Sequence, residues 1–86
     1  MIGPSMDRSR AAQLFGRILK EHRHSAGLSQ EAVAEGASLH RTFVGMIEGG
    51  RRVPTILTVW KLANSLEISL PELMAQVDTA YRQDEL

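Results

Sequence analysis

The sequence predicts a small all-α domain built from five helices. Apolar residues recur at helical spacing along five stretches, and glycine, proline or serine residues separate these stretches. No stretch alternates apolar and polar residues for long enough to form a strand. The chain has 86 residues, 43% of them hydrophobic, which suits one domain with one modest core.

The first helix is predicted to run from about Arg10 to Ser25, with Gly27 placed to end it. The apolar residues of its buried face are Leu14, Phe15, Ile18 and Leu19. The charged residues that fall largely on its other faces are Arg17, Lys20, Glu21 and Arg23. Residues 1–10 lack a periodic pattern, so we expect a disordered N-terminal tail before a domain of residues 11–78.

Two short helices are expected next, joined by a tight turn. Ser29 is a natural N-cap for the first of them, which buries Val33 and Ala34. Ser38 is expected to start the second, which ends at the glycine pair of residues 49–50. The residues that it turns inward are Leu39, Val44 and Ile47.

Thr55 is expected to cap a fourth helix. The core stripe of that helix is Ile56, Val59, Leu62, Ala63 and Leu66. Ser69 and Glu72 form a capping box, with Pro71 near the start of a fifth helix. The apolar residues along that helix are Leu73, Met74 and Val77. Residues 79–86 are expected to form a C-terminal tail.

Residues 28–48 carry the strongest functional signal, because two short helices joined by a tight turn make a helix-turn-helix. A second helix that enters the DNA major groove N-terminus first brings its outward side chains to base edges. The expected base contacts are His40, Arg41, Thr42 and Met46. The sequence therefore predicts double-stranded DNA as the partner.

Arg41 is the strongest candidate for sequence specificity. Its guanidinium matches the O6 and N7 acceptors of guanine, and a good bidentate contact contributes about 1–3 kcal/mol of discrimination. Thr42 offers a hydroxyl and a methyl group, Met46 offers apolar contact, and Gly45 permits close approach of the backbone. The alternative for Arg41 is a solvated surface arginine.

The charge distribution agrees with a DNA partner, although the formal net charge is zero. Residues 8–61 hold nine Lys or Arg against four acids, a net of +5. Residues 62–86 hold one arginine against five acids, a net of −4. A basic front and an acidic back suit a protein that faces phosphate with one side. Ordinary solvated charge is the alternative.

Several motifs stand in order along the chain: Leu-Ser-Gln-Glu-x-x-Ala at 28–34, His-Arg-Thr at 40–42, Ile-Glu-x-Gly at 47–50, a proline at 54, and Lys-Leu-Ala-x-x-Leu at 61–66. Over about residues 12–75 the chain resembles the Cro/C1-type (XRE) helix-turn-helix regulators, which include phage repressor DNA-binding domains. Residues 39–43 most resemble the controller proteins of restriction–modification systems. The resemblance implies a repressor-like five-helix fold and DNA binding.

The expected contacts to the DNA backbone are Gln30, Phe43, Arg51, Arg52 and Thr55. In the family, a glutamine at the position of Gln30 holds phosphate and braces the recognition helix. Phe43 has two interpretations: it presses on the sugar-phosphate wall, or it folds back onto the domain. The alternative is that Gln30, Arg51 and Arg52 are ordinary exposed polar residues.

Two further residues have local roles. Glu48 would repel phosphate, so we expect it to pair with a nearby arginine. Ser38 stands where the family favours glycine, and a turn with positive φ would strain a serine.

A single helix-turn-helix covers only half of a two-fold site, so such proteins usually pair. The expected homodimer interface is Leu57, Trp60, Leu70, Leu73, Met74, Val77 and Tyr81. An exposed apolar patch of this kind would suit a two-fold interface. The alternative is that these residues cap the core of a small domain.

The predicted function is a sequence-specific transcriptional regulator, either a repressor or an autoregulatory controller, that binds an inverted-repeat operator as a homodimer. The alternative is a protein-interaction module, such as an antitoxin or adaptor. The spacing of the three histidines predicts no metal site, and no spacing supports catalysis, a cofactor or a small-molecule ligand. The absence of cysteine, of a membrane span of about 18 apolar residues and of a signal peptide favours the cytoplasm.

Overall fold

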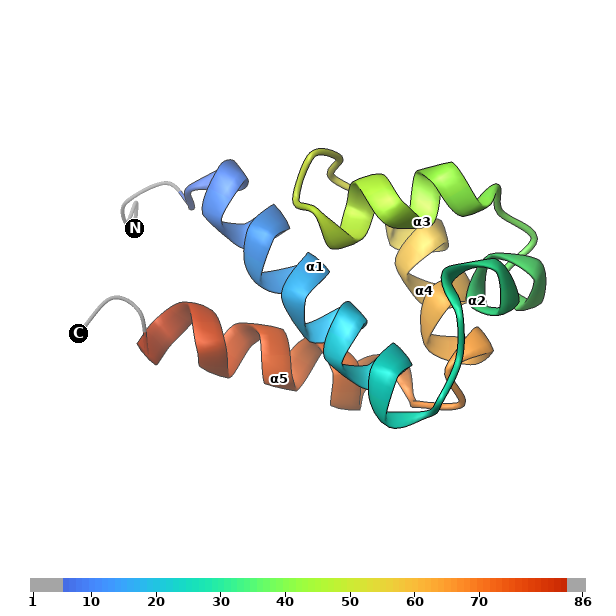
Figure 1. Cartoon of the computed structure of the whole chain (residues 1–86). Helices are drawn as coiled ribbons and strands as arrows, with labels where there is room; N and C mark the ends of the chain where they lie inside the picture. The colour runs from blue at the N-terminus through green and yellow to red at the C-terminus, as the bar shows by residue number, and fades with distance from the viewer. Residues whose placement is uncertain (1–5, 84–86) are drawn as a thin grey trace.

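The computed structural model describes residues 6–83, which form five α-helices and no strand (Figure 1). The helices are α1 (Arg8–Ser25), α2 (Gln30–Gly36), α3 (Arg41–Glu48), α4 (Ile56–Ser65) and α5 (Leu70–Gln83). The prediction of an all-α, five-helix fold is therefore confirmed. Within these residues, no helix is both long enough and apolar enough to cross a membrane.

The helices share one core. The long helix α1 packs against α3 on one side and against α5 on the other (Figure 1). Helix α2 packs on α3 and α4, and α4 packs in turn on α5. The largest fully buried side chains come from all five helices: Leu19, Val33, Val44, Ile47, Leu62 and Leu73. This shared core holds α2 and α3 in a fixed relation.

The predicted helix caps at Ser29, Thr55 and Ser69 are confirmed. In each case the side-chain oxygen accepts the backbone N–H of the residue three positions further on, at 3.0 to 3.2 Å. Each cap satisfies one of the backbone donors that a helix N-terminus leaves without an intrahelical partner.

The start of α3 differs from the prediction. His40, rather than Ser38, is its N-cap, and the Nδ1 of His40 accepts the Thr42 N–H at 3.1 Å. Ser38 lies in the turn between the two helices with φ of 56°, a left-handed conformation that favours glycine. The expected strain at Ser38 is therefore present. Because Ser38 belongs to the turn, it does not cap α3.

Both predicted tails are shorter than expected. Residues 8–10 belong to α1 and residues 79–83 belong to α5, and Tyr81 joins the start of α1 to the last turns of α5. Its hydroxyl accepts the Asp7 N–H at 2.8 Å, and its carbonyl oxygen accepts Nη2 of Arg10 at 2.6 Å. The Arg10 guanidinium also stacks 3.8 Å from the ring centroid. Residues 1–5 and 84–86 of the predicted tails lie outside the described residues.

Two burial predictions are wrong. Ile56 was expected in the core stripe of α4, but its side chain is 77% exposed, because the first turn of α4 extends past the core. The deepest residues of α4 are Leu62 and Ala63 instead. Arg23 was expected on a solvent-facing side of α1, but it is buried beneath α3.

Candidate nucleic-acid interface

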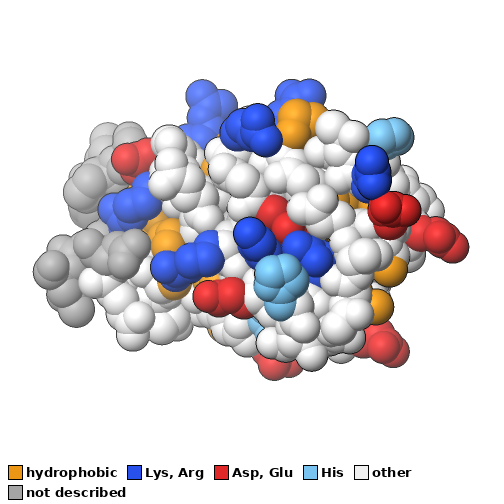
Figure 2. Space-filling view, viewed as in Figure 1, with side chains coloured by type: hydrophobic (Ala, Val, Ile, Leu, Met, Phe, Trp, Pro, Cys, Tyr) orange, Lys and Arg blue, Asp and Glu red, His pale blue; other side chains and the backbone are white. Residues whose placement is uncertain are grey.

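Helix α3 presents one face to solvent, and polar side chains surround it. A shallow, open depression on this face is lined by Gln30, Arg41, Thr42, Gly45, Met46 and Arg51, which we call the α3 face. Lys and Arg side chains stand over the edge of the molecule where α3 and the following loop lie (Figure 2). The structure thus brings Arg41, Thr42 and Met46 together with two of the predicted phosphate contacts.

The first turn of α3 carries the polar side chains best placed to meet a ligand. Arg41 and Thr42 are exposed, and Met46 is half-buried one turn further on. Nη1 of Arg41 donates a 2.8 Å hydrogen bond to Oε1 of Glu31 on α2. His40 precedes the helix as its cap, so Nδ1 of its ring is held by the backbone of its own helix.

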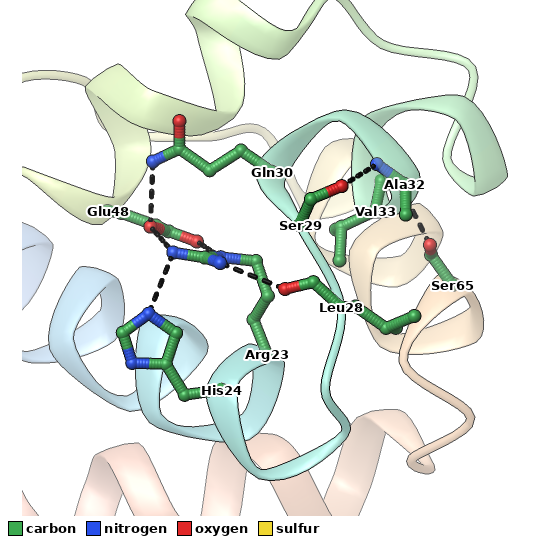
Figure 3. Close-up of polar contacts among 9 residues, drawn as sticks. All are labelled: Arg23, His24, Leu28, Ser29, Gln30, Ala32, Val33, Glu48 and Ser65. Carbon is green, nitrogen blue, oxygen red and sulfur yellow. Dashed lines mark hydrogen bonds and ion pairs between the residues drawn. The ribbon is translucent and has the colours of Figure 1, made fainter.

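Beneath the α3 face lies a buried ion pair between Arg23 of α1 and Glu48 at the end of α3 (Figure 3). Nε and Nη2 of Arg23 donate to the two carboxylate oxygens at 2.6 and 3.0 Å. The two side chains are only 9% and 3% exposed. Glu48 therefore pairs with an arginine as expected, but with one that lies 25 positions earlier in the chain.

The ion pair is extended by three further contacts into a network (Figure 3). Nη1 of Arg23 donates to the Leu28 carbonyl oxygen at 2.9 Å, and Nε2 of Gln30 donates to Oε1 of Glu48 at 3.0 Å. Nη2 of Arg23 also lies 3.2 Å from Nε2 of His24. The network therefore joins the end of α1, the start of α2 and the end of α3, and it supports the bracing role expected of Gln30.

The network also sets the charge states of the pair. Burial by itself would raise the pKa of Glu48, but the hydrogen bonds from Arg23 and Gln30 outweigh burial and lower that pKa below its ordinary value. The hydrogen bond to Glu48 raises the pKa of Arg23 against the opposing effect of burial. Both groups are thus held in their charged forms, and the negative charge of Glu48 is neutralised below the α3 face.

A close backbone contact fixes the position of α3 against α1. A Cβ at Gly16 would overlap the carbonyl oxygen of Ile47 and lie 2.6 Å from that of Glu48. Only glycine lets α1 approach the last turn of α3 this closely. The sequence alone predicts no functional role for Gly16 or for Arg23. The signal for Arg23 was its position four residues after Leu19, which places both on the same face of α1.

The remaining predicted backbone contacts differ in their surroundings. Arg51 and Arg52 are exposed in the loop between α3 and α4. Phe43 is half-buried against the core, with the Arg52 guanidinium 5.9 Å from its ring centroid, so the ring lies back on the domain. The Thr55 hydroxyl caps α4 and also donates to Oγ1 of Thr58 at 3.1 Å.

The predicted dimer residues divide into two groups. Leu73, Val77 and Tyr81 are buried within the chain itself, so the prediction that they face a partner is wrong for these three. Their side chains fill the space between α5 and its neighbours. Leu57 and Trp60 remain 63% and 52% exposed, Met74 is also exposed, and Leu70 is half-buried.

The exposed apolar side chains of this region form a patch that the sequence analysis described only in part. We define the α4 patch as Val53, Ile56, Leu57, Trp60 and Met74. Ile56 and Leu57 lie four and three positions before Trp60, so they are its neighbours on the α4 surface. Ile56 and Met74 line one hollow together, and Val53 and Met74 line another.

Among residues 6–83, no three His, Asp or Glu side chains gather as metal ligands.

The sequence is similar to a known family and to several curated proteins. A family model described as Helix-turn-helix matches residues 19–73. The control protein C.SmaI of Serratia marcescens is 34% identical over 64 residues, which cover 74% of this chain and 76% of the relative. The control protein C.MunI of a Mycoplasma species is 35% identical over 65 residues, which cover 74% and 88%.

A solved structure of another controller protein is also similar to this chain. The restriction–modification controller protein C.AhdI of Aeromonas hydrophila superposes with a TM-score of 0.70 at 40% identity, over 72% of this chain and 94% of that one. The chain therefore belongs to the helix-turn-helix family of XRE type, and it is a DNA-binding transcriptional regulator rather than an enzyme.

Proposed function

We propose that this regulator binds an inverted-repeat DNA operator as a homodimer and acts as a repressor or an autoregulatory controller. The observation that carries the proposal is the α3 face, where Arg41, Thr42 and Met46 share one open surface with Gln30 and Arg51. A helix docked through this face places its first turn, which carries Arg41, in the major groove.

The proposal assigns two kinds of contact to the α3 face and its surroundings. Arg41, Thr42 and Met46 read base edges, with His40 at the point of entry. Gln30, Arg51 and Arg52 neutralise or bind phosphate and set the register of the helix. The network of Arg23 and Glu48 supports this division, because it fixes the end of α3 and leaves the side chains of Arg41 and Thr42 in the first turn exposed.

A second copy of the chain is the proposed occupant of the α4 patch. Its five apolar residues are 41% to 77% exposed, which is unusual for large apolar side chains gathered on one surface. The patch lies on α4, α5 and the end of the loop before α4, and it includes no residue of the α3 face. Self-association through its α4 and α5 residues would leave both reading helices accessible. The relatives named as control or controller proteins support the proposed role of a controller.

The same α4 patch favours one other function, that of an antitoxin or adaptor whose patch binds a different protein. The two functions make opposite predictions about DNA. A dimeric operator-binding protein selects one sequence and shows a steep dependence on salt, whereas an adaptor shows weak and unselective binding.

Selection of bound duplexes from a randomised DNA pool tests the proposal. We expect an enriched inverted repeat whose half-sites lie about one helical turn apart. The Arg41→Ala variant, taken through the same selection, is expected to lose its preference at one base pair in each half-site. Enrichment of a single unrepeated half-site would overturn the dimer, and no enrichment at all would overturn sequence-specific binding and favour the adaptor.

A further inference from the structure

An exposed ion pair joins the two helices of the helix-turn-helix at the point where DNA is expected. Oε1 of Glu31, in the first turn of α2, accepts Nη1 of Arg41 at 2.8 Å, in the first turn of α3. The side chains are 70% and 64% exposed, so the pair lies on the surface rather than in the core. An ion pair of this kind contributes little to folding stability. Its position beside the proposed base-reading side chain calls for a different role.

We propose that Glu31 is a positioning residue that orients the Arg41 guanidinium and thereby sets base discrimination. The inference rests on the proposed function, in which Arg41 reads a base pair. Glu31 itself touches no base in this proposal. It acts through Arg41, by limiting the conformations of that side chain before DNA arrives.

The geometry of the guanidinium makes this division of contacts possible. The group is planar, with five N–H donors in a rigid fork. Glu31 engages Nη1 alone, so the edge formed by Nε and Nη2 remains for the O6 and N7 acceptors of guanine. An arginine side chain has many rotamers in solution, and holding one donor reduces the entropy that binding must remove.

The carboxylate of Glu31 also has a cost for binding. A negative charge beside the α3 face repels phosphate whatever the base sequence. Glu31 thus weakens general affinity for DNA while it strengthens discrimination at one base pair. These two effects appear in different measurements, because the first shifts all dissociation constants together and the second shifts their ratio.

The test measures that ratio at constant salt. Dissociation constants are determined for the selected operator and for a duplex in which the base pair identified by Arg41→Ala is replaced. We expect Glu31→Gln to reduce the ratio by about two- to fivefold, the range that an exposed ion pair allows. Combined with Arg41→Ala, Glu31→Gln is expected to cause no further reduction.

Glu35→Gln is the matched control, since it removes the same charge from an exposed position of the same helix. It is expected to leave the ratio unchanged. An unchanged ratio in Glu31→Gln, with all affinities raised, would overturn positioning and leave only the repulsion of phosphate. A wild-type protein that selects an operator whose preferences Arg41→Ala does not alter would overturn the inference but not the proposed function. A wild-type protein with no sequence preference would overturn both.

Discussion

The guanidinium of Arg23 donates to both carboxylate oxygens of Glu48, at 2.6 and 3.0 Å, across 25 positions of sequence. One partner lies near the end of α1 and the other is the last residue of α3. The pair is buried and charged, and Gln30 donates a third hydrogen bond to the carboxylate. The recognition helix is therefore held at its C-terminal end by a polar contact with the longest helix of the fold.

Removing one partner of this pair is expected to be costly. Arg23→Met leaves Glu48 buried without its counter-charge, and we expect the free energy of unfolding to fall by about 3–5 kcal/mol. Urea denaturation monitored by circular dichroism measures the change. Arg17→Met removes an exposed arginine of the same helix and should change stability by less than about 0.5 kcal/mol. If the two variants lose equal stability, the pair contributes nothing beyond ordinary surface charge.

The same pair predicts a pH dependence with a definite sign. The pKa of Glu48 is lowered in the folded protein from its usual value of 4.5, so its contribution to stability is present above that value. The contribution is lost as pH falls through the folded-state pKa, because the unfolded chain then binds the proton more tightly. Unfolding free energies measured from pH 7 downward should fall less steeply below pH 4.5 for Glu48→Gln than for the wild type. Equal slopes in that range would exclude a linkage through Glu48.

Gly16→Ala tests the close approach of α1 to α3. Alanine normally stabilises a helix interior relative to glycine by about 0.5–1 kcal/mol. At Gly16 the new methyl group would overlap backbone oxygens, so we expect a loss of about 1–3 kcal/mol instead. Gly45→Ala is the matched control within α3, because its Cβ would meet only the Gln30 side chain at 3.5 Å. Thermal denaturation should move in opposite directions for the two variants.

Replacing Arg41 and replacing Arg51 are expected to change DNA binding in different ways. Arg41→Ala should lose about 1–3 kcal/mol of discrimination at one base pair of each half-site. Arg51→Ala should weaken binding to all duplexes about equally and reduce the slope of log affinity against log salt by about 1. Binding isotherms at several salt concentrations separate the two effects. A uniform loss in both variants would remove Arg41 from base reading.

If the α4 patch is the dimer interface, a charge placed in it should weaken self-association. Trp60→Glu places a charge at an exposed apolar position, and we expect the dimer dissociation constant to rise at least about tenfold. Sedimentation over a wide concentration range measures it. Thr79→Glu adds the same charge to an exposed position of α5 outside the α4 patch and should leave association unchanged. A wild-type chain that stays monomeric throughout the DNA-binding range would contradict the dimer.

Local features of the fold were predictable because they depend on near neighbours in the chain. The caps at Ser29, Thr55 and Ser69 follow from side chains three residues before the donors they satisfy. The outward position of Arg41 and Thr42 follows from helical spacing within α3 alone. The family resemblance added the expectation that Gln30 braces the recognition helix.

The sequence by itself thus determined five helices, most of their caps and the side chains that α3 turns to solvent. Only the tertiary structure decided which arginine pairs with Glu48, that α1 needs glycine at residue 16, and that Leu73 and Tyr81 serve the chain's own core. Helical spacing gives the relative directions of side chains on one helix. Contacts between residues far apart in sequence decide which of those side chains another helix covers. Helical periodicity does not predict these contacts.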